Sequence, residues 1–100
     1  MAKREEMIEI MAENLPVLRK KAGVTQEELA ETLGISKYTV LSVEKKRRRM
    51  TWNTFLSLFL VFSMNEKTNG MLSFLGLPRD EVNSVINKEK EKETDYGKYV

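Results

Sequence analysis

Two residue types that commonly carry chemistry are absent from this chain. It contains no cysteine, which excludes disulfide bonds and thiolate metal sites, and no histidine, the commonest metal ligand and general base. We therefore expect no metal, no cofactor and no catalytic site, so an enzyme is the least favoured class of protein. Long apolar runs are also missing, because the most apolar stretch, 55–62, is far shorter than the ~20 residues of a membrane-spanning helix.

The N-terminal residues lack the form of a signal peptide, because charged side chains interrupt the apolar ones throughout 1–13. This pattern indicates a cytoplasmic protein. The length of 100 residues and the hydrophobic content of 41% fit a single domain with one modest core.

Positive charge is concentrated in one part of the chain, although the net charge is only +2. Residues 15–50 carry nine basic and four acidic side chains, which gives +5, whereas 1–14 carry −2 and 51–100 carry −1. Five of the basic residues are consecutive, from Lys45 to Arg49. Such a run is commonly a solvated loop, but it also suits binding to a phosphate backbone.

Apolar residues recur at helical spacing, and no segment alternates in the way that a half-buried strand does. The spacing predicts an all-α fold, a compact bundle of about five helices plus a C-terminal helix. The first helix is expected to end at Gly23. Pro16 interrupts its apolar stripe, so either Asn14 caps a helix with Pro16 in its first turn, or a longer helix kinks there.

The boundaries of the next helices are visible in the sequence. Thr25 and Glu28 have the spacing of a capping box, in which each side chain satisfies a backbone N–H of the other residue. Gly34 suits a helix end that requires a positive φ. Ser36 and Thr51 are the predicted N-caps of the two helices that follow.

The stretch from Gln26 to Lys45 has the pattern of two helices that cross through a tight turn. Ala30 is small where the second helix passes the first, and Gly34 lies at the turn. The apolar positions expected to share a core are Leu29, Leu33, Ile35, Val40 and Val43. Together these features meet the physical requirements of a helix-turn-helix.

Residues 11–64 resemble the phage-repressor-like (Xre/Cro) helix-turn-helix family of transcriptional regulators. The matching motifs are Leu15-x-x-Leu18-Arg19, Gly23-Val24-Thr25-Gln26-Glu27-Glu28-Leu29-Ala30, Leu33-Gly34-Ile35-Ser36 and Val40-x-x-Val43-Glu44. The resemblance implies a bundle whose third helix, 36–45, reads the major groove of double-stranded DNA. The predicted divisions are a DNA-binding domain over 7–64, a dimerisation extension over 65–90 and a charged, disordered tail over 91–100.

The family's roles are carried over by position. The residues implied to contact bases are Lys37, Tyr38, Thr39 and Ser42, and those implied to contact phosphates are Gln26, Ser36, Lys45, Lys46, Arg47, Arg48 and Arg49. Arg19 and Glu44 match a structural ion pair between the first and third helices. The excess of apolar residues in the C-terminal half predicts a dimer interface that includes Phe59, Leu60, Leu72, Val82 and Ile86.

The chain departs from the family directly after the third helix. The family usually has Glu-Asn-Gly followed by a basic residue, whereas this chain reads Glu44-Lys45-Lys46-Arg47. Met50 also replaces a frequent proline. The turn after the third helix is still basic, but it lacks the glycine that the family usually has there. Leu60 occupies a position that is usually polar in the family, which favours an interface there.

From these features we predict a homodimeric, sequence-specific DNA-binding repressor. A second hypothesis keeps the DNA binding and adds a toxin as protein partner, which would make the chain the antitoxin of a toxin–antitoxin pair. A third is a helical interaction module that has lost DNA binding, and the basic run 45–49 argues against it.

Overall fold

The computed structural model describes residues 3–87, and every regular element in that range is a helix. The helices are α1 (Lys3–Ala22), α2 (Gln26–Leu33), α3 (Lys37–Glu44), α4 (Trp52–Met64) and α5 (Asn69–Phe74), and residues 79–87 are also helical. The predicted all-α class is therefore confirmed. None of the helices within 3–87 is long and apolar enough to cross a membrane. The predicted tail, 91–100, lies outside the described residues.

The first helix runs without a break through Pro16. Asn14 does not cap a new helix, since its side-chain amide donates a hydrogen bond of 2.8 Å to the carbonyl oxygen of Ile10, inside the same helix. Of the two predicted alternatives, the longer helix is therefore the observed one. Pro16 has no N–H to offer the carbonyl of Ala12, so α1 lacks one backbone hydrogen bond at this point.

The next helix boundaries follow the predicted caps. The Thr25 hydroxyl accepts from the backbone N–H of Glu28 at 3.0 Å, and the Glu28 carboxylate accepts from the N–H of Thr25 at 2.9 Å. Gly34 ends α2 with a φ of 71°. Ser36 and Thr51 cap α3 and α4 through their side-chain oxygens. Each cap of this kind is worth about 1 kcal/mol, and together they fix where the short helices begin.

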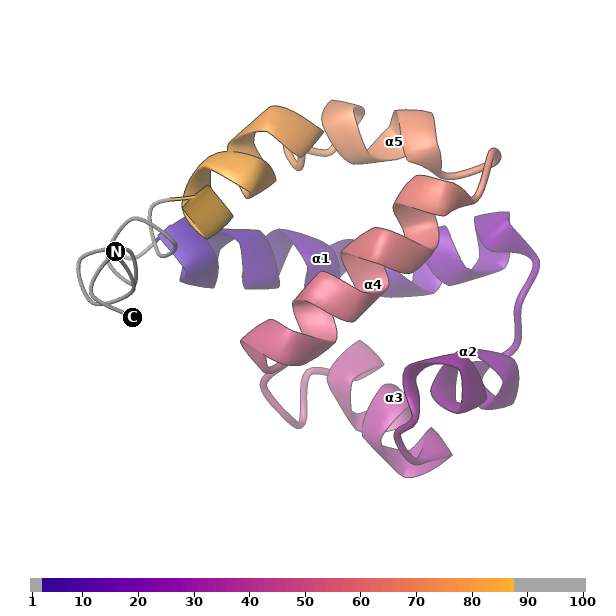
Figure 1. Ribbon diagram of the computed structural model, residues 1–100. Coiled ribbons are helices and arrows are strands. Elements are labelled where there is room, and N and C mark those ends of the chain that lie inside the picture. The colour runs from indigo at the N-terminus through magenta and orange to yellow at the C-terminus, as the bar shows by residue number, and fades with distance from the viewer. Residues whose placement is uncertain (1–2, 88–100) are drawn as a thin grey trace, which may run out of the picture.

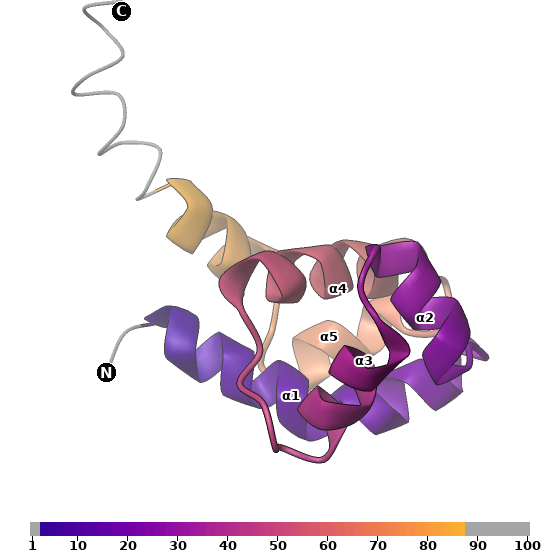
Figure 2. The same cartoon turned by 90° about the horizontal axis from the view of Figure 1, so that it is seen from below.

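The helices are arranged in two groups on either side of α1. Figure 1 shows α2 and α3 on one side, and α5 with the helix 79–87 on the other, while α4 crosses from the end of α3 to the start of α5. Figure 2 presents the same molecule from the side of α2 and α3, with α5 behind them. The helix-turn-helix is thus exposed on one face, away from the C-terminal helices.

The C-terminal helices contribute to the same core as α1 and α4. Leu72 and Val82, which were predicted at a dimer interface, are only 3% and 1% exposed within the single chain. Neither is available as a surface contact, so this part of the prediction is corrected. Of the other predicted interface residues, Phe59 is half-buried, whereas Leu60 and Ile86 are 59% and 39% exposed.

Candidate nucleic-acid interface

The helices α2 and α3 pack against each other through small and branched side chains. Ala30 is 3% exposed at the crossing, and Val40 and Val43 are buried on the facing side of α3. The turn between the helices is closed by a hydrogen bond of 3.0 Å from the N–H of Ile35 to the carbonyl of Ala30. Because Ala30 is buried, a larger side chain at position 30 would have to displace its neighbours, and the short turn leaves the helices little freedom to separate.

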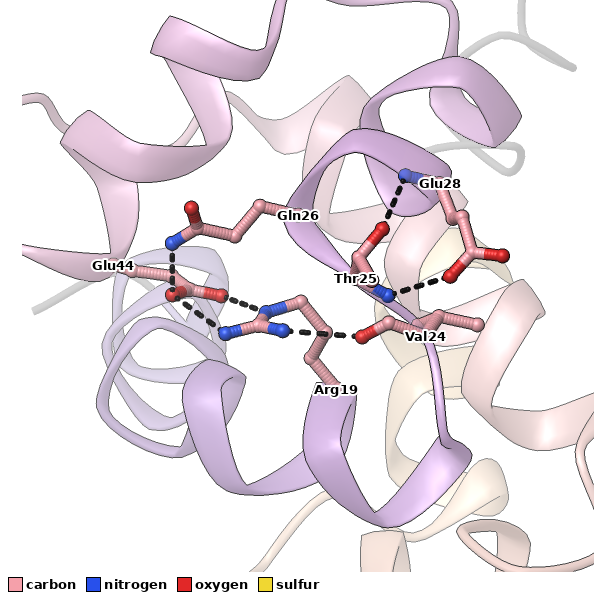
Figure 3. Close-up of polar contacts among 6 residues, drawn as sticks. All are labelled: Arg19, Val24, Thr25, Gln26, Glu28 and Glu44. Carbon is pink, nitrogen blue, oxygen red and sulfur yellow. Dashed lines mark hydrogen bonds and ion pairs between the residues drawn. The ribbon is translucent and has the colours of Figure 1, made fainter.

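A polar cluster fixes α3 to α1 and α2 (Figure 3). Nε of Arg19 lies 2.6 Å from Oε2 of Glu44, and Nη2 of Arg19 lies 3.4 Å from Oε1 of the same carboxylate. Their side chains are only 12% and 7% exposed. The guanidinium also donates to the carbonyl of Val24 at 3.1 Å, and Nε2 of Gln26 donates to Oε1 of Glu44 at 2.9 Å.

This cluster holds the end of α3 in a defined orientation. Glu44 is the last residue of α3, Arg19 lies in the last turn of α1, and Gln26 is the first residue of α2. The ion pair that the resemblance implied is present. Because both charges are largely removed from water, loss of either partner would leave an unpaired buried charge.

The first turn of α3 faces solvent. Ser36 and Lys37 are exposed, Thr39 is half-buried, and the aromatic side chain of Tyr38 is 64% exposed. An aromatic residue of this size is usually covered in a folded domain, so its exposure at the start of α3 marks the surface as one suited to contacts with another molecule.

Ser42 does not share this exposure. It is 4% exposed, so its side chain is not available to a base edge, and its predicted base contact is corrected. The physical reason is the course of the chain after α3. The backbone N–H groups of Arg47 and Arg48 both donate to the carbonyl of Ser42, at 2.8 and 3.3 Å, which brings the following loop back over this turn of the helix.

The loop after α3 keeps the left-handed conformation that a glycine would favour. Lys46, which stands where the family usually has glycine, has a φ of 59° and is the one non-glycine residue with positive φ within 3–87. A residue with a side chain in the left-handed conformation is destabilised by about 1–2 kcal/mol relative to the right-handed one. The backbone at this position thus adopts the conformation that a glycine favours, although the residue is a lysine.

Two carboxylates of α1 hold this loop from the other side. Lys46 forms an ion pair with Glu13, and Nη2 of Arg49 lies 3.7 Å from Oε1 of Glu5. All five cations of the loop, 45–49, are exposed. These glutamates were not predicted as partners of the loop, although the spacing of four between Glu5, Glu9 and Glu13 marks an acidic stripe along α1.

A second polar surface lies at the start of α2. An open hollow there is lined by residues of α1, α2 and α3, including Lys20, Gln26, Glu27 and Lys37. Nζ of Lys37 lies 3.6 Å from Oε1 of Glu27, and both side chains are exposed. The N-terminus of a helix attracts anions because its first backbone N–H groups are unpaired and its dipole is positive at that end.

Comparisons with known proteins agree with this geometry. The model of a helix-turn-helix family matches residues 18–51, which include α2, α3 and the basic loop. The control protein C.SmaI of Serratia marcescens is 33% identical over 73 residues, a match that covers 73% of this chain and 84% of that protein. No solved structure matches the chain.

The match with the control protein extends beyond the helix-turn-helix itself. It covers more than twice the 34 residues spanned by the family model, so the similarity includes helices outside α2 and α3. The caps, the buried Arg19–Glu44 pair and all of the motif residues except Leu15 lie within residues 18–51. The chain therefore belongs to the phage-repressor-like (Xre/Cro) helix-turn-helix family, and it is a DNA-binding transcriptional regulator rather than an enzyme.

Proposed function

We propose that this chain is a homodimeric control protein of the cytoplasm that represses transcription by binding a two-fold symmetric site in double-stranded DNA. The observation that supports the proposal most strongly is the exposed first turn of α3 beside the cationic loop 45–49. One surface thus offers side chains that suit base edges and charges that suit phosphates. Base contacts provide sequence preference, and phosphate contacts provide affinity and orientation.

The proposed reading residues are those at the exposed start of α3. Lys37 offers an ammonium donor and Tyr38 a phenolic group at the end of a rigid ring, both directed away from the core. In the proposed complex Thr39 stands between them and the loop. Ser42 has no part in this reading surface because it is buried.

The proposed phosphate contacts surround this reading surface. Lys45 and Arg47 lie beyond the C-terminal end of α3, while Ser36 and Gln26 lie at the N-terminal ends of α3 and α2. Lys45 and Arg47 are cations, which bind the phosphate backbone of DNA of any sequence and release its counterions. Gln26 already donates to Glu44, so its amide both braces α3 and stands near the path proposed for the backbone.

A second copy of the chain is the proposed partner of the exposed apolar face of α4. Leu60 and Met64 lie four residues apart on one face of that helix and are 59% and 79% exposed. One recognition helix in one groove gives limited affinity, whereas a symmetric dimer doubles the contacts on a palindromic site. Repression then requires only that the bound dimer exclude the polymerase from the same duplex.

Selection of bound oligonucleotides from a random pool tests the proposal. The parent protein should enrich a palindromic motif with half-sites about 10–10.5 base pairs apart, or a multiple of that distance. Lys37→Ala should change the preferred bases, whereas Lys67→Ala, an exposed lysine between α4 and α5, should leave them unchanged. A pool without any enriched motif would refute sequence-specific binding.

Sedimentation tests the dimer. Leu60→Glu should shift the protein towards the monomer and weaken binding to a full site far more than binding to a half-site. Val17→Glu is a matched control, because Val17 is 56% exposed on α1, outside the proposed interface. A parent protein that sediments as a monomer at tens of micromolar and gives no symmetric motif would contradict the model.

A further inference from the structure

The cations of the loop 45–49 do not all point the same way. Lys46 and Arg49 are held against the glutamates of α1. Arg48, which lies between them, turns instead to the outer side of α3, where its Nη1 donates a hydrogen bond of 3.1 Å to Oγ1 of Thr39. The two ion pairs lie on either side of Arg48 along the chain, so the loop contacts α1 on both sides of the residue that contacts α3.

Thr39 is itself held by the start of α3. Its Oγ1 lies 2.9 Å from Oγ of Ser36, which in turn accepts the capping hydrogen bond from the N–H of Thr39. The hydroxyl of Thr39 is therefore already engaged on both sides, by Ser36 and by Arg48. This arrangement makes Thr39 a poor partner for a base and a good support for a guanidinium.

We infer that Arg48 is a base-reading residue, and that it recognises a guanine in the major groove while Thr39 positions it. The inference rests on the proposed function, since it needs α3 to lie in that groove. It differs from the role implied by the family resemblance, which assigned Arg48 to the phosphates together with the rest of the loop. Lys45 and Arg47 keep the phosphate role.

The chemistry of the guanidinium favours guanine. Its N–H donors form a rigid planar fork, and one hydrogen bond to Thr39 leaves a pair of parallel donors on the remaining side. In the major groove guanine presents two adjacent acceptors, N7 and O6, at the spacing of such a fork. A guanidinium whose direction is already fixed loses less conformational freedom when it binds, which improves discrimination rather than general affinity.

The test compares the sequence preferences of four proteins at one salt concentration: the parent, Arg48→Lys, Arg48→Ala and Arg79→Lys. The parent should select a guanine at one position of each half-site. Arg48→Lys retains the charge but not the fork, so discrimination at that position should fall by about five- to 150-fold, with an unchanged salt dependence. Arg79→Lys, the matched control at an exposed arginine of the helix 79–87, outside the proposed DNA-binding surface, should select the parent motif.

Thr39→Val tests the positioning role with a side chain of similar shape. It should weaken discrimination at the same guanine position, and it should have no further effect there when Arg48 is already alanine. Equal melting temperatures across the variants exclude a loss of fold.

If the Arg48 variants select the parent motif unchanged, or if that motif has no guanine, the inference is wrong although the proposed function stands. If the parent protein selects no motif, both fail.

Discussion

Removal of the Glu44 carboxylate should destabilise the whole fold, although the residue lies at the end of an eight-residue helix. In the variant Glu44→Ala, the guanidinium of Arg19 keeps its hydrogen bond to the carbonyl of Val24 but loses its ion pair with Glu44, and the side-chain amide of Gln26 loses its acceptor. With side chains 12% and 7% exposed, water cannot readily replace the lost contacts.

Breaking one partner of a buried ion pair costs about 3–5 kcal/mol. A domain of this size has a free energy of unfolding of only about 5–15 kcal/mol, so the loss is a large part of the total. For a domain of 60–100 residues, a loss of 3 kcal/mol should lower the melting temperature by roughly 12 °C or more. Urea denaturation followed by circular dichroism measures the free energy, and a thermal scan measures the melting temperature.

Two further variants make the test specific. Glu31→Ala removes an exposed glutamate from α2 and should change the free energy of unfolding by no more than about 0.5 kcal/mol. The double variant Arg19→Met with Glu44→Ala should be more stable than the sum of the two single losses predicts, because no unpaired charge remains. A loss below about 1 kcal/mol for Glu44→Ala, or strict additivity in the double variant, would refute the argument that this pair is buried and coupled.

Three other predictions follow from the packing, the backbone and the charge. Ala30→Leu should lower the free energy of unfolding by about 1–3 kcal/mol, because position 30 lies at the crossing of α2 and α3, and an unchanged melting temperature would show that no tight crossing exists. Lys46→Gly should be about 1–2 kcal/mol more stable than Lys45→Gly, since φ is 59° at position 46 and −89° at position 45; equal stabilities would contradict the strained backbone. If the dimer contacts 6–10 phosphates, its affinity for DNA should fall by about 10³–10⁵ between 50 and 200 mM salt, and a flat dependence would remove the loop 45–49 from the interface.

The sequence predicted the helix-turn-helix well because its signals are local. The capping box of Thr25 and Glu28, the left-handed Gly34 and the cap at Ser36 each depend on residues within a few positions of one another. The Arg19–Glu44 pair spans 25 residues, and only the resemblance to a known family pointed to it.

The parts that sequence reasoning missed depend on tertiary contacts. Leu72 and Val82 are apolar residues that fit a core and an interface equally well, and only the packing of the C-terminal helices on α1 and α4 decides between them. Ser42 is buried near the end of α3, where the loop that follows folds back and donates two backbone hydrogen bonds to its carbonyl. The partners of Lys46 and Arg49 lie more than 30 residues away on α1. At that separation the pattern of charges along the chain does not show which basic residue meets which acidic one.

The measurement that tests the central claim most directly is methylation interference on the selected DNA site. Dimethyl sulfate modifies guanine N7 in the major groove and adenine N3 in the minor groove, so one experiment reports on both grooves. If α3 reads the major groove as a dimer, methylation of guanine N7 should block binding at symmetry-related positions about 10–10.5 base pairs apart, and adenine N3 at those positions should have little effect. On a site with guanines in both half-sites, interference by adenine N3 without any by guanine N7 would contradict recognition of the major groove by this helix-turn-helix.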